Sequence, residues 1–68
     1  MMTTAYQQLS PRERQITELV AQSKQNKDIA FRLGLTENTV KQYLNRLFKK
    51  RDIHSRVELA IMYVRGEI

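Results

Sequence analysis

Apolar residues recur along this chain at the spacing of α-helices, and no segment alternates apolar and polar residues as a strand does. The pattern predicts an all-α fold, a four-helix bundle-like domain. The first helix is predicted to begin after Ser10, because Ser10 and Glu13 have the spacing of a capping box, with Pro11 at the first helical position. Its buried stripe follows at Ile16, Leu19 and Val20.

The second and third helices are predicted to form a helix–turn–helix. Asn26 is the predicted N-cap of the second helix, and Gly34 is placed to end it in the left-handed conformation. Thr36 then caps the third helix, so the connection is about three residues long and contains glycine. Ala30 supplies the small residue needed where the two helices cross. The apolar residues that would fix the crossing angle are Ile29, Leu33, Leu35, Val40 and Tyr43.

The third helix, over about residues 37–50, has two different faces. With Val40 at 0° and a step of ~100° per residue, its apolar residues fall between about −20° and +80°. These are Val40, Leu44, Leu47 and Phe48. Polar residues occupy the opposite side, at Asn38, Gln42, Asn45 and Lys49, with Lys41 and Arg46 flanking them. We therefore expect one buried face and one outward face that offers hydrogen bonds and positive charge, as a helix in a DNA groove requires.

The fourth helix has a second capping-box spacing, from Ser55 to Glu58, and ends at Gly66. Its apolar residues surround nearly the whole circumference, so the domain core covers only one side of it. The uncovered strip is predicted to consist of Val57, Ile61 and Val64. We expect this strip to contact its symmetry mate in a homodimer. Because the patch is small, we expect the two copies to pair on DNA, where adjacent half-sites raise the effective concentration.

The charge of the chain is concentrated in one segment. Twelve Lys and Arg against seven Asp and Glu give a net charge of +5. Residues 41–51 hold the excess, with no acid among them, at Lys41, Arg46, Lys49, Lys50 and Arg51. Clustered positive charge favours a polyanionic partner, although a solvated basic helix face is the plainer interpretation of charge alone.

Length and composition exclude several classes of protein. Sixty-eight residues make one small domain, which we divide into a lead-in at residues 1–8 and the domain at 9–68. The absence of cysteine excludes disulfides and zinc–thiolate sites, and His54 has no partner at metal spacing. We expect no enzyme, cofactor, metal or small-molecule ligand, and no catalytic residues. Without an apolar span of roughly 20 residues or a signal segment, we expect a cytoplasmic location and no membrane partner.

Three stretches of this sequence closely resemble the LuxR/GerE/FixJ DNA-binding domain. They are Leu9–Arg14, Asn26–Ala30 and Leu33–Lys41, and the resemblance continues through Leu47, the basic run at residues 49–51 and Ser55-Arg56. The resemblance covers roughly residues 9–66. It implies four helices, with the second and third forming the helix–turn–helix and the fourth mediating dimerisation on DNA. It also implies the effector domain of a bacterial transcription regulator, in the response-regulator family.

The resemblance also implies roles for particular residues. Lys41, Gln42 and Asn45 match positions that face base edges in the major groove. Asn26, Lys27, Thr36 and Thr39 match positions that hold the phosphate backbone. Arg46 and Lys49 are predicted to hold further phosphates. The helical wheel agrees for Gln42 and Asn45, whose amides can each make paired hydrogen bonds to adenine.

Two other functions stay open at this point. A sigma-factor region-four-like module, which contacts RNA polymerase as well as promoter DNA, begins with a similar Ser-Pro-Arg-Glu-Arg segment. The fourth helix after the basic run argues against that module. A protein-interaction domain that has lost DNA binding is the other alternative, and the basic groove-facing helix argues against it.

Overall fold

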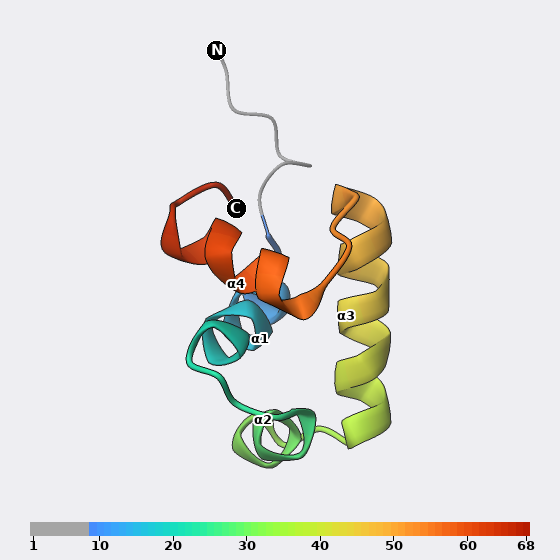
Figure 1. Cartoon of the computed structure of the whole chain (residues 1–68). Helices are drawn as coiled ribbons and strands as arrows, with labels where there is room; N and C mark the ends of the chain where they lie inside the picture. Colours follow the sequence, from blue (N-terminus) through green and yellow to red (C-terminus); the bar gives the residue numbers. More distant parts are fainter. Residues whose placement is uncertain (1–8) are drawn as a thin grey trace.

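The computed structural model of this chain describes residues 9–68, so the predicted lead-in lies outside the described residues. The described part contains four helices and no strand: α1 (Pro11–Ala21), α2 (Asn26–Leu33), α3 (Glu37–Arg51) and α4 (Arg56–Val64). The predicted all-α fold is therefore confirmed. The helix α1 packs against each of the other three, and α2 also packs against α3. In Figure 1, α3 runs along one side of the domain, with α2 near its N-terminal end.

One hydrophobic core joins all four helices. Each helix contributes at least one fully buried side chain, and Leu9 and Ile53 close the core from the segments outside the helices. The buried apolar residues are Leu9, Ile16, Val20, Ile29, Ala30, Val40, Leu44, Leu47, Ile53 and Leu59. They include Val40, Leu44 and Leu47 of the stripe predicted for α3, whereas Phe48, its fourth member, is only partly buried against the core. The opposite face of α3 is thereby turned away from the core.

Side-chain caps begin three of the four helices. The Oγ of Ser10 accepts from the N–H of Glu13, and the carboxylate of Glu13 accepts from the N–H of Ser10 at 2.9 Å, which completes a capping box. Ser55 accepts from the N–H of Glu58, but the Glu58 carboxylate accepts from the N–H of His54 instead, one residue before the cap. The second predicted capping box is therefore only half formed.

The start of α2 differs from the prediction. Gln25 occupies the N-cap and makes no side-chain capping bond, while Asn26 is already inside the helix. Asn26 as N-cap is thus wrong, because its amide oxygen accepts from Arg56 of α4 instead. The end of α2 is as expected. Gly34 has φ of 69°, and the N–H of Leu35 donates to the carbonyl of Ala30 at 2.8 Å, as in a glycine-terminated helix.

Candidate nucleic-acid interface

The outward face of α3 consists of long polar side chains over a buried apolar stripe. Lys41, Gln42, Asn45 and Lys49 are all exposed, and Val40, Leu44 and Leu47 behind them are buried. Arg46 lies beside this face with its guanidinium carbon 5.0 Å from the centre of the Tyr43 ring. A cation over a ring face is attracted to it, so Tyr43 holds the Arg46 charge next to the polar face while leaving it exposed.

The basic residues of the segment 41–51 do not all lie on one surface of α3. Lys50 turns toward α1, where its Nζ lies 3.3 Å from an oxygen of Glu13. Arg51 is half-buried, whereas Lys41, Arg46 and Lys49 are exposed. The charge excess therefore lies on α3, but its last two residues, Lys50 and Arg51, are not part of the outward face. Around the helix axis, position 50 lies ~280° from Val40, on the side away from Asn45.

Glu13 is stabilised as a carboxylate by this arrangement. Partial burial acts to raise its pKa, but hydrogen bonds from the N–H of Ser10 and from Lys50 outweigh that effect. The pKa of Glu13 consequently lies below its ordinary value of 4.5. The ion pair joins the N-terminus of α1 to the C-terminus of α3 and so helps to set the position of α3.

The threonines that start α3 bind each other as well as the backbone. Thr36 Oγ1 accepts from the N–H of Thr39 at 3.0 Å and donates to Thr39 Oγ1 at 2.9 Å. The Thr39 hydroxyl proton is then available to another acceptor. The N–H groups of Glu37 and Asn38, in the first turn, also have no carbonyl partner within the helix. This end of α3 therefore offers donors and the positive end of the helix dipole to an anion.

The first turn of α2 places Lys27 and Asn26 next to each other. The Lys27 side chain is exposed, and the Asn26 side chain is half-buried. Arg56 donates to Asn26 Oδ1 at 2.6 Å and to the backbone carbonyl of Lys24 at 2.5 Å. Sequence reasoning did not find this link. Its partners are thirty or more residues apart, and no local pattern indicates it.

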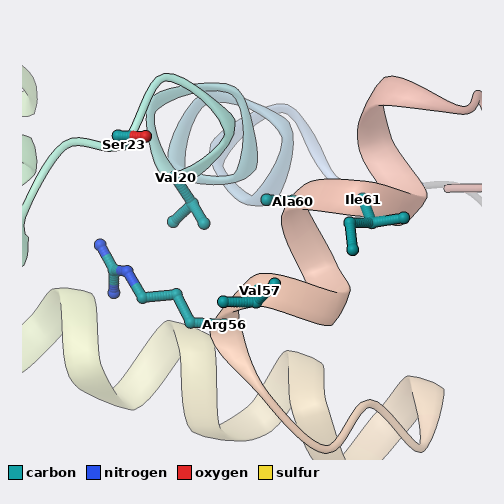
Figure 2. A pocket seen from close by; sticks show the side chains of 6 residues that line it. All are labelled: Val20, Ser23, Arg56, Val57, Ala60 and Ile61. Carbon is teal, nitrogen blue, oxygen red and sulfur yellow. The ribbon is translucent and has the colours of Figure 1, made fainter.

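The apolar strip of α4 is exposed as predicted. The exposed fractions are 68% for Val57, 49% for Ile61 and 75% for Val64, while Leu59 is fully buried. Beside the strip lies a hollow of about 290 Å³ between α1 and α4. Figure 2 shows the residues that line it, Val20, Ser23, Arg56, Val57, Ala60 and Ile61. The strip's role as a dimer contact stays a prediction.

A fourth large apolar side chain, Phe31 on α2, is 85% exposed and was not singled out from the sequence. The helical wheel could have found it, since it falls about 100° or more from Ile29, Ala30 and Leu33. Residues 9–68 show no group of three or more His, Cys, Asp or Glu arranged to hold a metal ion. None of the helices described is both long and apolar enough to cross a membrane.

The comparisons with known proteins agree on one family. The family model for bacterial regulatory proteins of the luxR family matches residues 7–63. The nitrate/nitrite response regulator protein NarL of Escherichia coli K12 is 52% identical over 54 residues, covering 79% of this chain and 25% of NarL. The two-component response regulator PprB of Pseudomonas aeruginosa is 42% identical over 53 residues, covering 78% of this chain and 19% of PprB.

A third relative is more distant in sequence. The transcriptional regulatory protein DesR of Bacillus subtilis is 33% identical over 61 residues, covering 85% of this chain and 31% of DesR. The chain thus spans between 19% and 31% of the length of these three relatives.

Proposed function

The chain belongs to the luxR family of bacterial regulatory proteins, and on that premise we propose that it recognises duplex DNA through α3, as a homodimer joined by α4. The family consists of DNA-binding transcription regulators and not of enzymes. Transcription regulation is therefore its general function. Such a regulator would act in the bacterial cytoplasm, on the nucleoid.

The proposal depends mainly on the exposed polar face of α3, which lies on the opposite side of the helix from its buried apolar stripe. Gln42 and Asn45 project from a helix whose other side is fixed in the core. Each amide carries one acceptor and two donor hydrogens, the pattern that pairs with adenine in the major groove. Lys41 has only donors, which suits guanine O6 and N7 or a phosphate. These three side chains are the proposed base contacts.

The proposed phosphate contacts surround that face. Thr36 and Thr39 lie at the N-terminus of α3, and Arg46 and Lys49 lie along its exposed side. Asn26 and Lys27 lie in the first turn of α2. Contacts of this kind fix the register of a protein on DNA without reading sequence, and they release counterions.

The proposed homodimer uses Val57, Ile61 and Val64. An exposed apolar strip on a helix that is otherwise packed is typical of a surface that meets a partner. A symmetric contact pairs the strip with itself. The strip is short, so two adjacent half-sites on DNA would supply the effective concentration that dimerisation needs.

A contact with a second protein, such as RNA polymerase, is the other candidate activity of this domain. It is favoured by Phe31, whose ring is 85% exposed on α2 and outside the α4 strip. An aromatic side chain so exposed is a common anchor in protein interfaces.

Binding to duplex DNA tests the main proposal. We expect the logarithm of the binding constant to fall steeply and linearly with the logarithm of salt concentration. Gln42→Ala and Asn45→Ala should each relax preference at particular base pairs and cost about 1–3 kcal/mol on the best site, as measured by selection from a random DNA library. Lys27→Ala should weaken binding to all sequences about equally.

Two results would count against the proposal. If no duplex in a diverse pool binds at ~50 mM salt, the domain does not act on DNA directly. If Gln42→Ala, Asn45→Ala and Lys27→Ala all lower affinity with the same preferred sequence, the division between base and phosphate contacts is wrong.

A further inference from the structure

Arg56 is the first residue of α4, yet its guanidinium lies against the start of the helix–turn–helix. Nη1 donates to Asn26 Oδ1 at 2.6 Å, and Nη2 donates to the carbonyl of Lys24 at 2.5 Å. Figure 2 shows the extended side chain leaving α4 beside Val57. A single residue of α4 therefore binds both the connection between α1 and α2 and the first turn of α2.

The hydrogen bonds of the Arg56 guanidinium are partly shielded from solvent. Arg56 is half-buried, and burial lowers the pKa of its guanidinium, which nevertheless keeps its charge because the pKa of a guanidinium lies far above neutral pH. A half-buried cation costs free energy unless its N–H groups have acceptors, and here two of its nitrogens donate to oxygens. Loss of the guanidinium would leave the carbonyl of Lys24 and the Oδ1 of Asn26 without these bonds.

The bond to Arg56 also fixes which way the Asn26 amide faces. An amide has its acceptor oxygen on one side and its two donor hydrogens on the other. Because Oδ1 accepts from Arg56, Nδ2 must be directed away from the guanidinium. The hydrogen bond that the Asn26 side chain makes within residues 9–68 is the one to Arg56 through Oδ1, and the exposed Lys27 follows in the same turn.

We propose that Arg56 is a positioning residue for DNA binding, which holds the first turn of α2 against α4 and orients Asn26 so that its N–H donors are free for a phosphate oxygen. The inference rests on the proposed function, since Asn26 is one of its phosphate contacts. It adds that a residue of α4, which is not one of the proposed DNA contacts, contributes to DNA affinity. It does so without touching DNA.

The experiment compares Arg56→Met with Arg65→Met. Both variants remove one positive charge near α4, but Arg65 is exposed, and its ion pair within residues 9–68 is with Glu67, at 3.3 Å. Dissociation constants for one duplex are measured at a salt concentration and temperature at which each variant is more than about 95% folded, so that stability does not enter. Asn26→Ala is measured in the wild-type and Arg56→Met backgrounds. The NMR order parameter of the Asn26 side-chain amide is measured without DNA.

We expect Arg56→Met to raise the dissociation constant about tenfold, consistent with the loss of a hydrogen bond to a charged phosphate, and Arg65→Met to raise it less than about twofold. Asn26→Ala should weaken binding in the wild type and change it little in the Arg56→Met background, because the two residues act as a unit. The order parameter of the Asn26 amide should fall in Arg56→Met and stay unchanged in Arg65→Met. A purely structural role for Arg56 would lower the free energy of unfolding but leave the affinity of the folded protein unchanged.

The inference is overturned if folded Arg56→Met binds as well as Arg65→Met, or if the Asn26 amide stays ordered without the guanidinium. If Arg56→Met does not fold, Arg56→Lys replaces it. Wild-type affinity in that variant, together with a mobile Asn26 amide, would likewise overturn the inference. If the wild type binds no duplex, the proposed function is overturned, and so is the contribution of Arg56 to DNA affinity. The NMR order parameter of the Asn26 amide would still show whether Arg56 orients Asn26.

Discussion

Ser23 and Asp52 hold left-handed backbone conformations without being glycine. Their φ angles are 65° and 55°, and each residue follows the last turn of a helix. In the left-handed region a side chain crowds the backbone, which costs roughly 1 kcal/mol for residues such as serine, whereas glycine, asparagine and aspartate tolerate it better. At Ser23 the turn is maintained by backbone bonds. The N–H of Ser23 donates to Val20 and that of Lys24 donates to Leu19.

We expect Ser23→Gly to raise the free energy of unfolding by about 0.5–1 kcal/mol, because glycine removes the strain at a positive φ. Urea denaturation followed by circular dichroism measures the change. The matched control is Gly34→Ala, at φ of 69°, where an added Cβ meets nothing within 4 Å. That variant should lose about 1 kcal/mol through backbone conformation alone. If Ser23→Gly is less stable than the wild type, the Ser23 side chain makes a contact that outweighs the strain.

Thr17 is a polar residue in the middle of the core. It is fully buried on α1, and its Oγ1 has no hydrogen-bond partner. A buried hydroxyl without a partner costs about 1–3 kcal/mol in lost hydration. Thr17→Val has the same shape without the hydroxyl, so we expect its unfolding midpoint in urea to stay the same or rise. Thr17→Ala, which leaves a cavity, should lower it. A lower midpoint for Thr17→Val would mean that the hydroxyl is bonded, for example to a buried water.

Local signals explain which residue-level predictions succeeded. The caps at Ser10 and Thr36 and the stop at Gly34 depend on residues within one turn, and all three were predictable. The cap at Asn26 failed because Arg56, thirty residues later, competes for its side chain. A side chain that can satisfy either a local or a distant partner is ambiguous in sequence alone.

At the scale of helices, the pair Glu13–Lys50 connects α1 with α3. The sequence alone allows other cations as the partner of Glu13, and Arg32 on α2 is one of them. Arg32 pairs instead with Asp28, one turn earlier on α2, at 3.0 Å. Lys50 takes its place beside Glu13. The choice among cations depends on how the helices cross, which helical periodicity does not specify.

The pKa of Glu13 leads to a pH dependence of stability. Its folded-state pKa lies below the ordinary value of 4.5, so the carboxylate stabilises the fold above that pH. This contribution is lost as pH falls through the folded-state pKa, as Glu13 becomes protonated. We expect the free energy of unfolding to decrease from about pH 5 downward, and Glu13→Gln to flatten that decrease.

Lys50→Met supplies the control for this pH dependence. It keeps the hydrogen bond from Ser10 and removes the ion pair, so the pKa of Glu13 should rise toward its ordinary value. Urea denaturation as a function of pH, with NMR titration of the Glu13 carboxyl carbon, measures both effects. An unchanged slope in Glu13→Gln would assign the acid sensitivity to other carboxylates.

For the molecule as a whole, the orientation of α3 was the most predictable feature. Its apolar stripe defines the buried side, so the outward position of Gln42 and Asn45 follows from the wheel and agrees with their exposure. The same wheel places Lys50 at ~280° and Arg51 at ~20°, away from that face. The concentration of charge in residues 41–51 describes position along the chain, and the angle around the helix decides which of these residues share the outward face.

The remaining whole-molecule question is how two copies meet, and the strip on α4 makes a specific prediction. Ile61→Glu should keep the fold, because Ile61 is 49% exposed and lies outside the buried core. It should also keep binding to a single half-site, since it lies on α4 rather than in the proposed DNA face. Cooperative occupancy of an operator with two half-sites should be lost. In the symmetric contact the carboxylate at position 61 of one copy would be buried next to the same carboxylate of the other copy.

Electrophoretic mobility shifts on operators with one and two half-sites measure this cooperativity. Gln15→Glu is the matched control, because it makes the same change of net charge at an exposed position of α1. It should lower affinity slightly through the charge and leave cooperativity intact. If Ile61→Glu also binds two half-sites cooperatively, with a native circular-dichroism spectrum, then the dimer contact lies elsewhere. The exposed strip would then be free for a different partner.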